Sequence, residues 1–302
     1  MSDSPLSPEA PQPEVVFARP VEMPPGALPG RLPGGAVRAR AVSAAQTPAS
    51  ATCLTLPGLP LRAAVVDFLL LLLVAAVALG GPSIVVGTWM AATGRELPDQ
   101  PTFRMMMSQQ LFQVILSIGL LSFLLWRRNL PSCAFGVQAH MPGQQLLWGA
   151  AGLGVAYGWM IFSVIVISAV LQLFPGLQSD LTKRQDLIEL LPDTFGKVII
   201  LMIPVAVSEE ILFRGLMLPY LRRITGYWWS AVLISTVIFA VLHFQQGILG
   251  ILQISGVAVV FALIFIYSRS LLAAIVAHFA FDVGQMLLVM LSKDMLKSYG
   301  LE

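Results

Sequence analysis

Residues 198–218 read VIILMIPVAVSEEILFRGLML, an apolar run interrupted by only three charged side chains, Glu209, Glu210 and Arg214. A helix needs about 20 apolar residues to cross the hydrocarbon core of a bilayer. Charged side chains are costly at that depth, so those that do occur there are functional candidates by default. The stretch therefore predicts a membrane-spanning helix whose few charges carry the chemistry of the protein.

Six further stretches have a similar length and hydrophobicity. They are residues 63–92, 109–126, 146–173, 228–245, 248–267 and 271–291. Short loops separate the last four spans, so we expect these spans to pack as antiparallel neighbours. Gly80-Gly81-Pro82 predicts a kink in the first span. The sequence thus predicts an all-α, polytopic membrane bundle of about seven transmembrane helices.

The composition of the 302-residue chain agrees with a membrane bundle. Hydrophobic residues make up 57% of the chain and charged residues 11%, whereas a soluble domain usually carries about 25% charged residues. These values exclude a soluble enzyme, a disordered regulator and a coiled coil. The net charge is only +2, so no nucleic-acid partner is expected. The two cysteines, Cys53 and Cys133, suggest neither a disulfide framework nor a cysteine-ligated zinc site.

Residues 1–56 differ from everything that follows them. Ten prolines fall between Pro5 and Pro48, among many Ser, Ala and Gly residues. Such a segment cannot bury enough apolar surface to offset its ordering entropy. We therefore predict a disordered Pro-rich tail, with a proline-rich docking site as the alternative, and assign residues 57–302 to the transmembrane bundle.

Lysine and arginine in the short loops indicate the orientation of the bundle. With seven spans, one end carries Arg62, Arg127, Arg128, Arg222, Arg223 and Arg269. The other end carries Arg95, Arg104, Lys183, Arg184 and Lys197. The tail adds further arginines to the first end. We therefore predict a cytoplasmic N-terminus for a multi-pass protein of the bacterial inner membrane.

The last four spans contain six ionisable side chains: Glu209, Glu210, Arg214, His243, His278 and Asp282. Glu210 and Arg214 are four residues apart, so they share a helix face and can pair. His278 and Asp282 have the same spacing and can point into one cavity. All six fall within apolar spans, which is compatible with a single polar chamber inside the bilayer.

Such a chamber can hydrolyse an amide. A carboxylate and an imidazole within reach of one water can take its proton and make it a nucleophile. A second imidazole and carboxylate can stabilise an oxyanion or coordinate zinc. Two histidines with carboxylates are the ligand types of a hydrolytic zinc site. The candidate zinc ligands are Glu209, His243, His278 and Asp282.

These side chains also have purely structural interpretations. Glu210 and Arg214 can form a salt bridge that only neutralises two buried charges. The imidazoles can serve only as partners in hydrogen bonds between helices. Phe239, one turn before His243, is interpreted as a packing residue. Asp67, in the first span, is interpreted as a snorkelling or capping residue.

Three short motifs in this region resemble those of a known protease family. Ser-Glu-Glu-Ile-Leu-Phe-Arg-Gly at residues 208–215 looks like the E-E-x-x-x-R motif of the CAAX prenyl protease and bacteriocin-processing (CPBP, or Abi) intramembrane proteases. The segment from Phe239 to His243 resembles the F-x-x-x-H motif of that family, and the segment from His278 to Asp282 resembles its H-x-x-x-N/D motif. The motifs keep the order of the family, and the resemblance covers about residues 197–291.

The resemblance implies glutamate-dependent proteolysis in an all-helical bundle. Glu209 would activate a water with help from His243, while His278 and Asp282 would bind a metal or stabilise the oxyanion. The supporting residues would be Glu210, Arg214 and Phe239. The substrate would be a membrane-associated peptide or protein, with prenylated CAAX peptides as one class.

Position 282 bears on the cofactor that the resemblance implies. Many relatives have Asn there, and an ionised Asp has no proton to donate to an oxyanion. Asp is a good metal ligand, so Asp282 favours a Zn²⁺ metalloprotease over a metal-free mechanism based on Glu and His. A protonated Asp282 would reverse this inference.

Two other functions would use the same residues. Some relatives are associated with bacteriocin immunity or act as membrane partners, so a non-catalytic binding protein is the first alternative. Intramembrane Glu, His and Asp side chains also form proton relays, which makes a proton-coupled transporter the second. No internal repeat is evident, and this weighs against the transporter.

Overall fold

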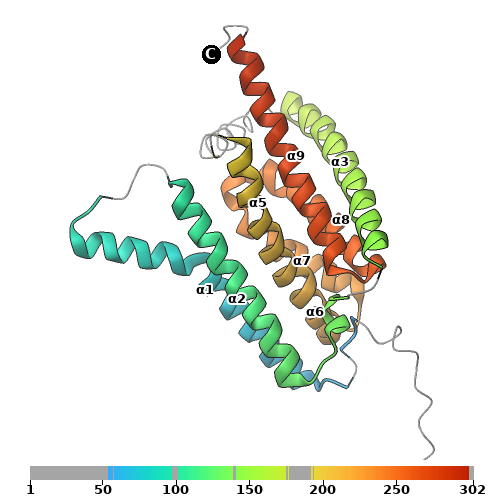
Figure 1. The fold of residues 1–302 in the computed structure, drawn as a ribbon. Helices are drawn as coiled ribbons and strands as arrows, with labels where there is room; N and C mark the ends of the chain where they lie inside the picture. Colours follow the sequence, from blue (N-terminus) through green and yellow to red (C-terminus); the bar gives the residue numbers. More distant parts are fainter. Residues whose placement is uncertain are drawn as a thin grey trace, which may run out of the picture. The chain divides into compact units, whose positions relative to one another are not determined.

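The computed structural model describes residues 54–56, 58–96, 101–138, 141–174, 176, 192 and 194–298. All regular structure in these ranges is helical (Figure 1). The chain first forms α1 (Leu61–Thr93), α2 (Phe103–Arg128) and α3 (Pro142–Leu173). It then forms α5 (Phe195–Glu210), a π-helical segment (Ile211–Met217), α6 (Leu218–Thr225), α7 (Trp228–Leu242), α8 (Gly247–Ser268) and α9 (Leu271–Ser298).

The prediction of an all-helical membrane bundle is confirmed. Five described helical stretches are long and apolar enough to cross a membrane: Leu61–Thr93, Phe103–Arg128, Pro142–Leu173, Phe244–Ser268 and Leu271–Ser292. The predicted fourth span is formed by α5, the π-helical segment and α6, which follow one another without a break. The predicted fifth span is α7, a shorter apolar helix of 15 residues.

The helices that carry the predicted site pack against one another. α9 lies along α3 and α5, and α8 lies along α3 and α7. Helix α3 comes close to its neighbours through glycines: a Cβ atom on Gly149 would lie 2.8 Å from Val276 of α9, and one on Gly152 would lie 2.7 Å from Ile264 of α8. These two close contacts hold α3 against α8 and α9, which form part of the wall of the space between α5, α7, α8 and α9.

Helix α1 pairs with α2 and α6. Its second half contains Pro82 and turns away from α2 in Figure 1, as the Gly-Gly-Pro sequence predicts. A proline inside a helix removes one backbone hydrogen bond and clashes with the preceding turn. The first half of α1 therefore carries most of the contacts that matter for the bundle, including those of the buried residues Asp67 and Leu71.

The arginine-rich end of the bundle is held together by polar contacts between distant segments. Asp67 is fully buried and accepts hydrogen bonds from Arg128 Nε at 2.8 Å and Nη2 at 2.7 Å. The Tyr220 hydroxyl donates to the same carboxylate at 3.2 Å. Arg223 Nε donates to the Leu59 carbonyl at 2.8 Å. The interpretation of Asp67 as a snorkelling or capping residue is therefore wrong, because the carboxylate joins α1, α2 and α6.

Two features of the described residues differ from expectation. Leu54 and Leu56 belong to the buried core, although the predicted tail extended to residue 56. Residues 1–53 lie outside the described residues, so the disorder expected there stays a prediction. Cys133, in the 3₁₀ turn Ser132–Phe135, is disulfide-bonded, which the sequence did not lead us to expect.

Candidate active site

The two glutamates lie where the helix changes its pitch. Helix α5 ends at Glu210, and the next seven residues form a π-helix, in which the Leu218 N–H bonds to the Phe213 carbonyl five residues back. Pro219 follows directly and has no N–H with which to continue the α-helical pattern. Such π-helical insertions are rare and concentrate at functional sites. Here the insertion changes the angle, about the helix axis, between the glutamates of α5 and the side chains of α6.

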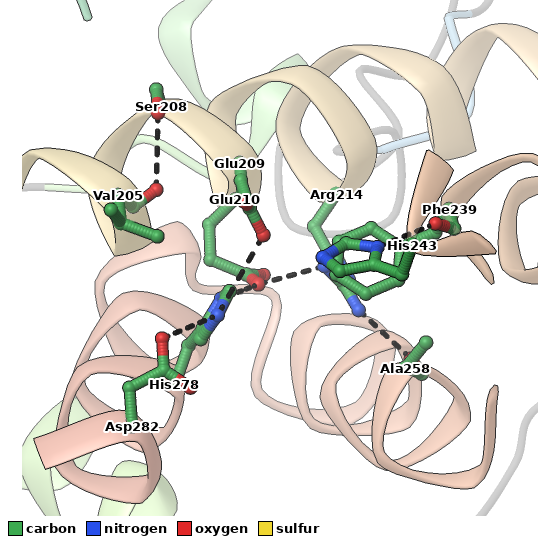
Figure 2. Close-up of polar contacts among 10 residues, drawn as sticks. All are labelled: Val205, Ser208, Glu209, Glu210, Arg214, Phe239, His243, Ala258, His278 and Asp282. Carbon is green, nitrogen blue, oxygen red and sulfur yellow. Dashed lines mark hydrogen bonds and ion pairs between the residues drawn. The ribbon is translucent and has the colours of Figure 1, made fainter. Parts of the chain in front are cut away.

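Glu210 is the centre of a buried hydrogen-bond network (Figure 2). Its Oε1 accepts a hydrogen bond from Arg214 Nη1 at 2.8 Å and another from His278 Nδ1 at 2.7 Å. The carboxylate is 0% exposed, so it depends entirely on these partners for its solvation. This pairing of Glu210 with Arg214 is the salt bridge that the sequence predicts.

The Arg214 side chain is held by a hydrogen bond to α8 and by contacts with two aromatic rings. Its Nη2 donates to the Ala258 carbonyl of α8 at 3.1 Å. The guanidinium lies between two aromatic rings, with Cζ 5.0 Å from the ring centroid of Phe239 and 5.6 Å from that of Phe261. Cation–π contacts of this kind are strongest where water is excluded. Phe239 therefore packs as the sequence predicts, and it packs against the charge that neutralises Glu210.

The imidazole of His278 connects this network to two further carboxylates. Its Nδ1 donates to Glu210. The opposite ring nitrogen, Nε2, lies 3.2 Å from Asp282 Oδ2 and 3.8 Å from Glu209 Oε2. An ionised carboxylate can only accept a hydrogen bond. The contacts at Nε2 therefore require one more proton, on the ring or on a carboxyl group. The three groups form a cluster that can take up and return a proton.

His243 lies at the C-terminal end of α7, and its orientation is set by its own helix. Its Nδ1 lies 2.8 Å from the Phe239 carbonyl oxygen, which can only accept. The proton of the neutral ring is therefore on Nδ1, and Nε2 carries the free lone pair. The F-x-x-x-H spacing has a physical reason here, because it places the ring one turn beyond the carbonyl that selects this tautomer.

One cavity of about 350 Å³ brings the predicted residues together. Its polar lining includes Glu209, His243, His278 and Asp282. They come from α5, from the end of α7 and from α9, so residues about 70 positions apart in the sequence face one space. Glu210 and Arg214 do not line the cavity and lie behind its wall. The remaining walls are mostly apolar, with Met202, Val205, Ile254, Val257 and Met286 among them.

The zinc site is the part of the prediction that the geometry does not assemble. Among the described residues, no group of three or more His, Cys, Asp or Glu side chains is placed to hold one metal ion. His278 Nδ1 is bonded to Glu210, and only the Nε2 side faces Asp282 and Glu209. The predicted ligand set of Glu209, His243, His278 and Asp282 stays a prediction.

Three glutamines also line the cavity, and the search for ionisable groups missed them. They are Gln246, Gln253 and Gln285. Gln253 Nε2 donates to Ser163 Oγ at 2.9 Å, and the backbone carbonyl of Gln253 accepts from Trp159 Nε1 at 2.8 Å, which links α8 to α3. An uncharged amide in an apolar span is also costly unless it is hydrogen-bonded. That cost is the signal in the sequence that could have identified them.

The similarity to a known family lies in the part of the chain that carries the candidate site. Residues 192–284 match the family model described as type II CAAX prenyl endopeptidase Rce1-like. The match covers less than a third of the chain, but it contains all six ionisable residues singled out in the sequence, and it confirms the resemblance. No curated protein and no solved structure matches the chain significantly.

The two adjacent glutamates are expected to differ in their effect on stability. Glu210→Gln leaves the buried Arg214 without its counter-charge, which should lower the free energy of unfolding by about 3–5 kcal/mol. Glu209→Gln faces the cavity and removes one of several clustered carboxylates, so we expect a change of about 1 kcal/mol or less. Thermal unfolding of the two purified variants, followed by circular dichroism, measures the difference. Equal destabilisation by both would contradict the network described above.

Proposed function

We propose, on the premise of the Rce1-like match at residues 192–284, that this membrane protein is an intramembrane endopeptidase that hydrolyses a peptide bond in a membrane-associated substrate. The observation that carries the proposal is the shared cavity, into which Glu209, His243, His278 and Asp282 all project. A buried polar chamber inside an otherwise apolar bundle is costly, and it is retained where chemistry or transport requires it.

The mechanism begins with a water between Glu209 and His243. His243 Nε2 has a free lone pair because Nδ1 is committed to the Phe239 carbonyl. It can accept a hydrogen bond from the water and orient it, while the Glu209 carboxylate takes the proton. The water oxygen then forms a bond to the carbonyl carbon of the substrate, and the carbonyl oxygen becomes an oxyanion.

His278 is the group we assign to the oxyanion. A protonated Nε2 can donate to the developing charge, and such pre-positioned donors supply a large part of the catalysis in acyl-transfer sites. Asp282 and Glu210 hold the ring from both nitrogens, at 3.2 and 2.7 Å. The C–N bond then breaks as Glu209 returns its proton to the leaving nitrogen, which balances the reaction. Arg214 holds the Glu210 carboxylate in place through a hydrogen bond of 2.8 Å.

The substrate class follows from the walls of the cavity and from the family. The walls are apolar and include Met160, Met202 and Met286, whose flexible side chains adapt to varied shapes. A lipid-modified or membrane-embedded peptide fits these walls better than a soluble one. We propose a prenylated CAAX-type peptide as the first substrate to test, in line with the description of the family.

Substitution of the water-activating residues tests the mechanism. Glu209→Gln and His243→Ala should each lower the turnover of a quenched fluorescent prenylated peptide by at least about 100-fold. Glu96→Gln, a carboxylate outside the cavity, is the matched control and should keep wild-type turnover. Full activity in either of these two variants would contradict the mechanism. A wild-type protein that binds the peptide but never cleaves it would instead favour a non-catalytic membrane partner.

Metal removal tests the cofactor. If the side chains of Glu209 and His243 suffice to activate the water, turnover should persist after dialysis against a chelator. Elemental analysis of the purified protein should then find metal well below one ion per chain. Stoichiometric zinc that is lost in His278→Ala, together with activity restored only by zinc, would establish the metalloprotease instead.

We also propose that the arginine-rich end faces the cytoplasm, in accordance with the bias of arginine toward that side. We expect alkaline phosphatase fused after Glu302 to be active in intact bacteria and green fluorescent protein at that position to be dark. A fluorescent C-terminal fusion with an inactive phosphatase would contradict this orientation.

A further inference from the structure

A second cavity, of about 460 Å³, lies at the arginine-rich end. It is lined by the residues that lead into α1 and by those at the end of α2. The lining residues are Gly58, Leu59, Pro60, Arg127, Arg128, Asn129, Leu130, Pro131 and Ala134. It shares no residue with the cavity of the active site, so the proposed proteolysis does not account for it.

The charge of this cavity is positive. Its charged lining residues are Arg127 and Arg128, and none of the described residues that line it is acidic. Arg128 is neutralised by Asp67, which accepts two of its hydrogen bonds. Arg127 is exposed, and no carboxylate of the described residues forms an ion pair with it; its guanidinium lies 5.7 Å from the ring centroid of Phe123. Arg223, bonded to the Leu59 carbonyl, adds a second cation beside the wall.

The position of the cavity indicates the kind of anion that it meets. Trp126, directly before Arg127, has 76% of its surface exposed, and the same end carries the exposed aromatics Tyr227, Trp229 and Tyr267. Exposed Trp and Tyr side chains of a membrane protein gather at the level of the lipid headgroups. Below this level, α1 exposes apolar side chains that include Leu69 and Leu73. A ligand here therefore meets cations at headgroup depth and a hydrocarbon surface beneath them.

We propose that this cavity binds the phosphate group of an anionic phospholipid whose acyl chains lie along α1 and α2. A guanidinium matches the geometry of a phosphate and can donate two parallel hydrogen bonds to it. Arg127 carries such a fork, and Asn129, which also lines the cavity, has a side-chain amide that can donate further hydrogen bonds. Basic pockets between membrane helices recognise anionic headgroups in this way. The proposal is independent of the proposed proteolysis.

The test uses the full-length protein in neutral detergent, titrated with phosphatidylglycerol, phosphatidylcholine or sodium phosphate. Native mass spectrometry counts the bound lipid, and the rise in unfolding temperature reports its effect. We expect phosphatidylglycerol to bind more tightly than phosphatidylcholine, and Arg127→Gln to weaken phosphatidylglycerol binding at least about fivefold. Arg127→Lys, which keeps the charge but loses the fork, should recover part of the affinity.

Arg95→Gln is the matched control. Arg95 is also exposed and also lies over an aromatic ring, 5.0 Å from the centroid of Trp89, but it is outside the cavity. An equal loss of affinity in Arg95→Gln and Arg127→Gln would reduce the effect to general surface charge and overturn the site. Binding of sodium phosphate as tight as that of phosphatidylglycerol would overturn the assignment to a lipid. Phosphatidylglycerol affinity that is unchanged in Arg127→Gln would overturn the role of that residue.

Discussion

The buried carboxylate of Glu210 is the constraint on which the rest of the site depends. A charge in a medium that cannot solvate it must be satisfied by fixed partners, and removal of one partner costs far more than the pair contributes. Arg214 and His278 are those partners, and Arg214 is held in turn by α8. The network thereby joins α5, α8 and α9 around the cavity. The orientation of His278, and through it the arrangement of Glu209 and Asp282, follows from this single carboxylate.

The number and type of the helices could be predicted from the sequence because hydrophobicity acts over whole segments. A run of about 20 apolar residues specifies a span almost regardless of its neighbours. The i,i+4 spacing of Glu210 and Arg214 likewise specified their pairing, since it depends only on helix geometry. The location of the candidate site could also be predicted, because an ionisable residue within an apolar span is costly and therefore indicates a functional position.

The contacts between distant segments were not predictable in this way. No local pattern indicates that Arg128 pairs with Asp67, 61 residues earlier in the chain, or that His278 Nδ1 bonds to Glu210 rather than to Glu209. Such pairings depend on which helices are neighbours and on how each helix is rotated about its axis. The rotation cannot be inferred from hydrophobicity, because hydrophobicity is similar all around a membrane helix. The π-helical segment was not predicted either, because its residues, ILFRGLM, carry no periodicity that separates a π-helix from an α-helix.

The π-helical segment has a consequence for how the two ends of the same helix can evolve. Glu209 must face the cavity and Glu210 must face His278, while Tyr220 must face Asp67, and the segment sets the helical phase between these positions. Loss of one residue within 211–217 would turn one side relative to the other by about 100°. Either the candidate active site or the anchor at the arginine-rich end would then lose its partners. Insertions and deletions should therefore be excluded from these seven buried positions.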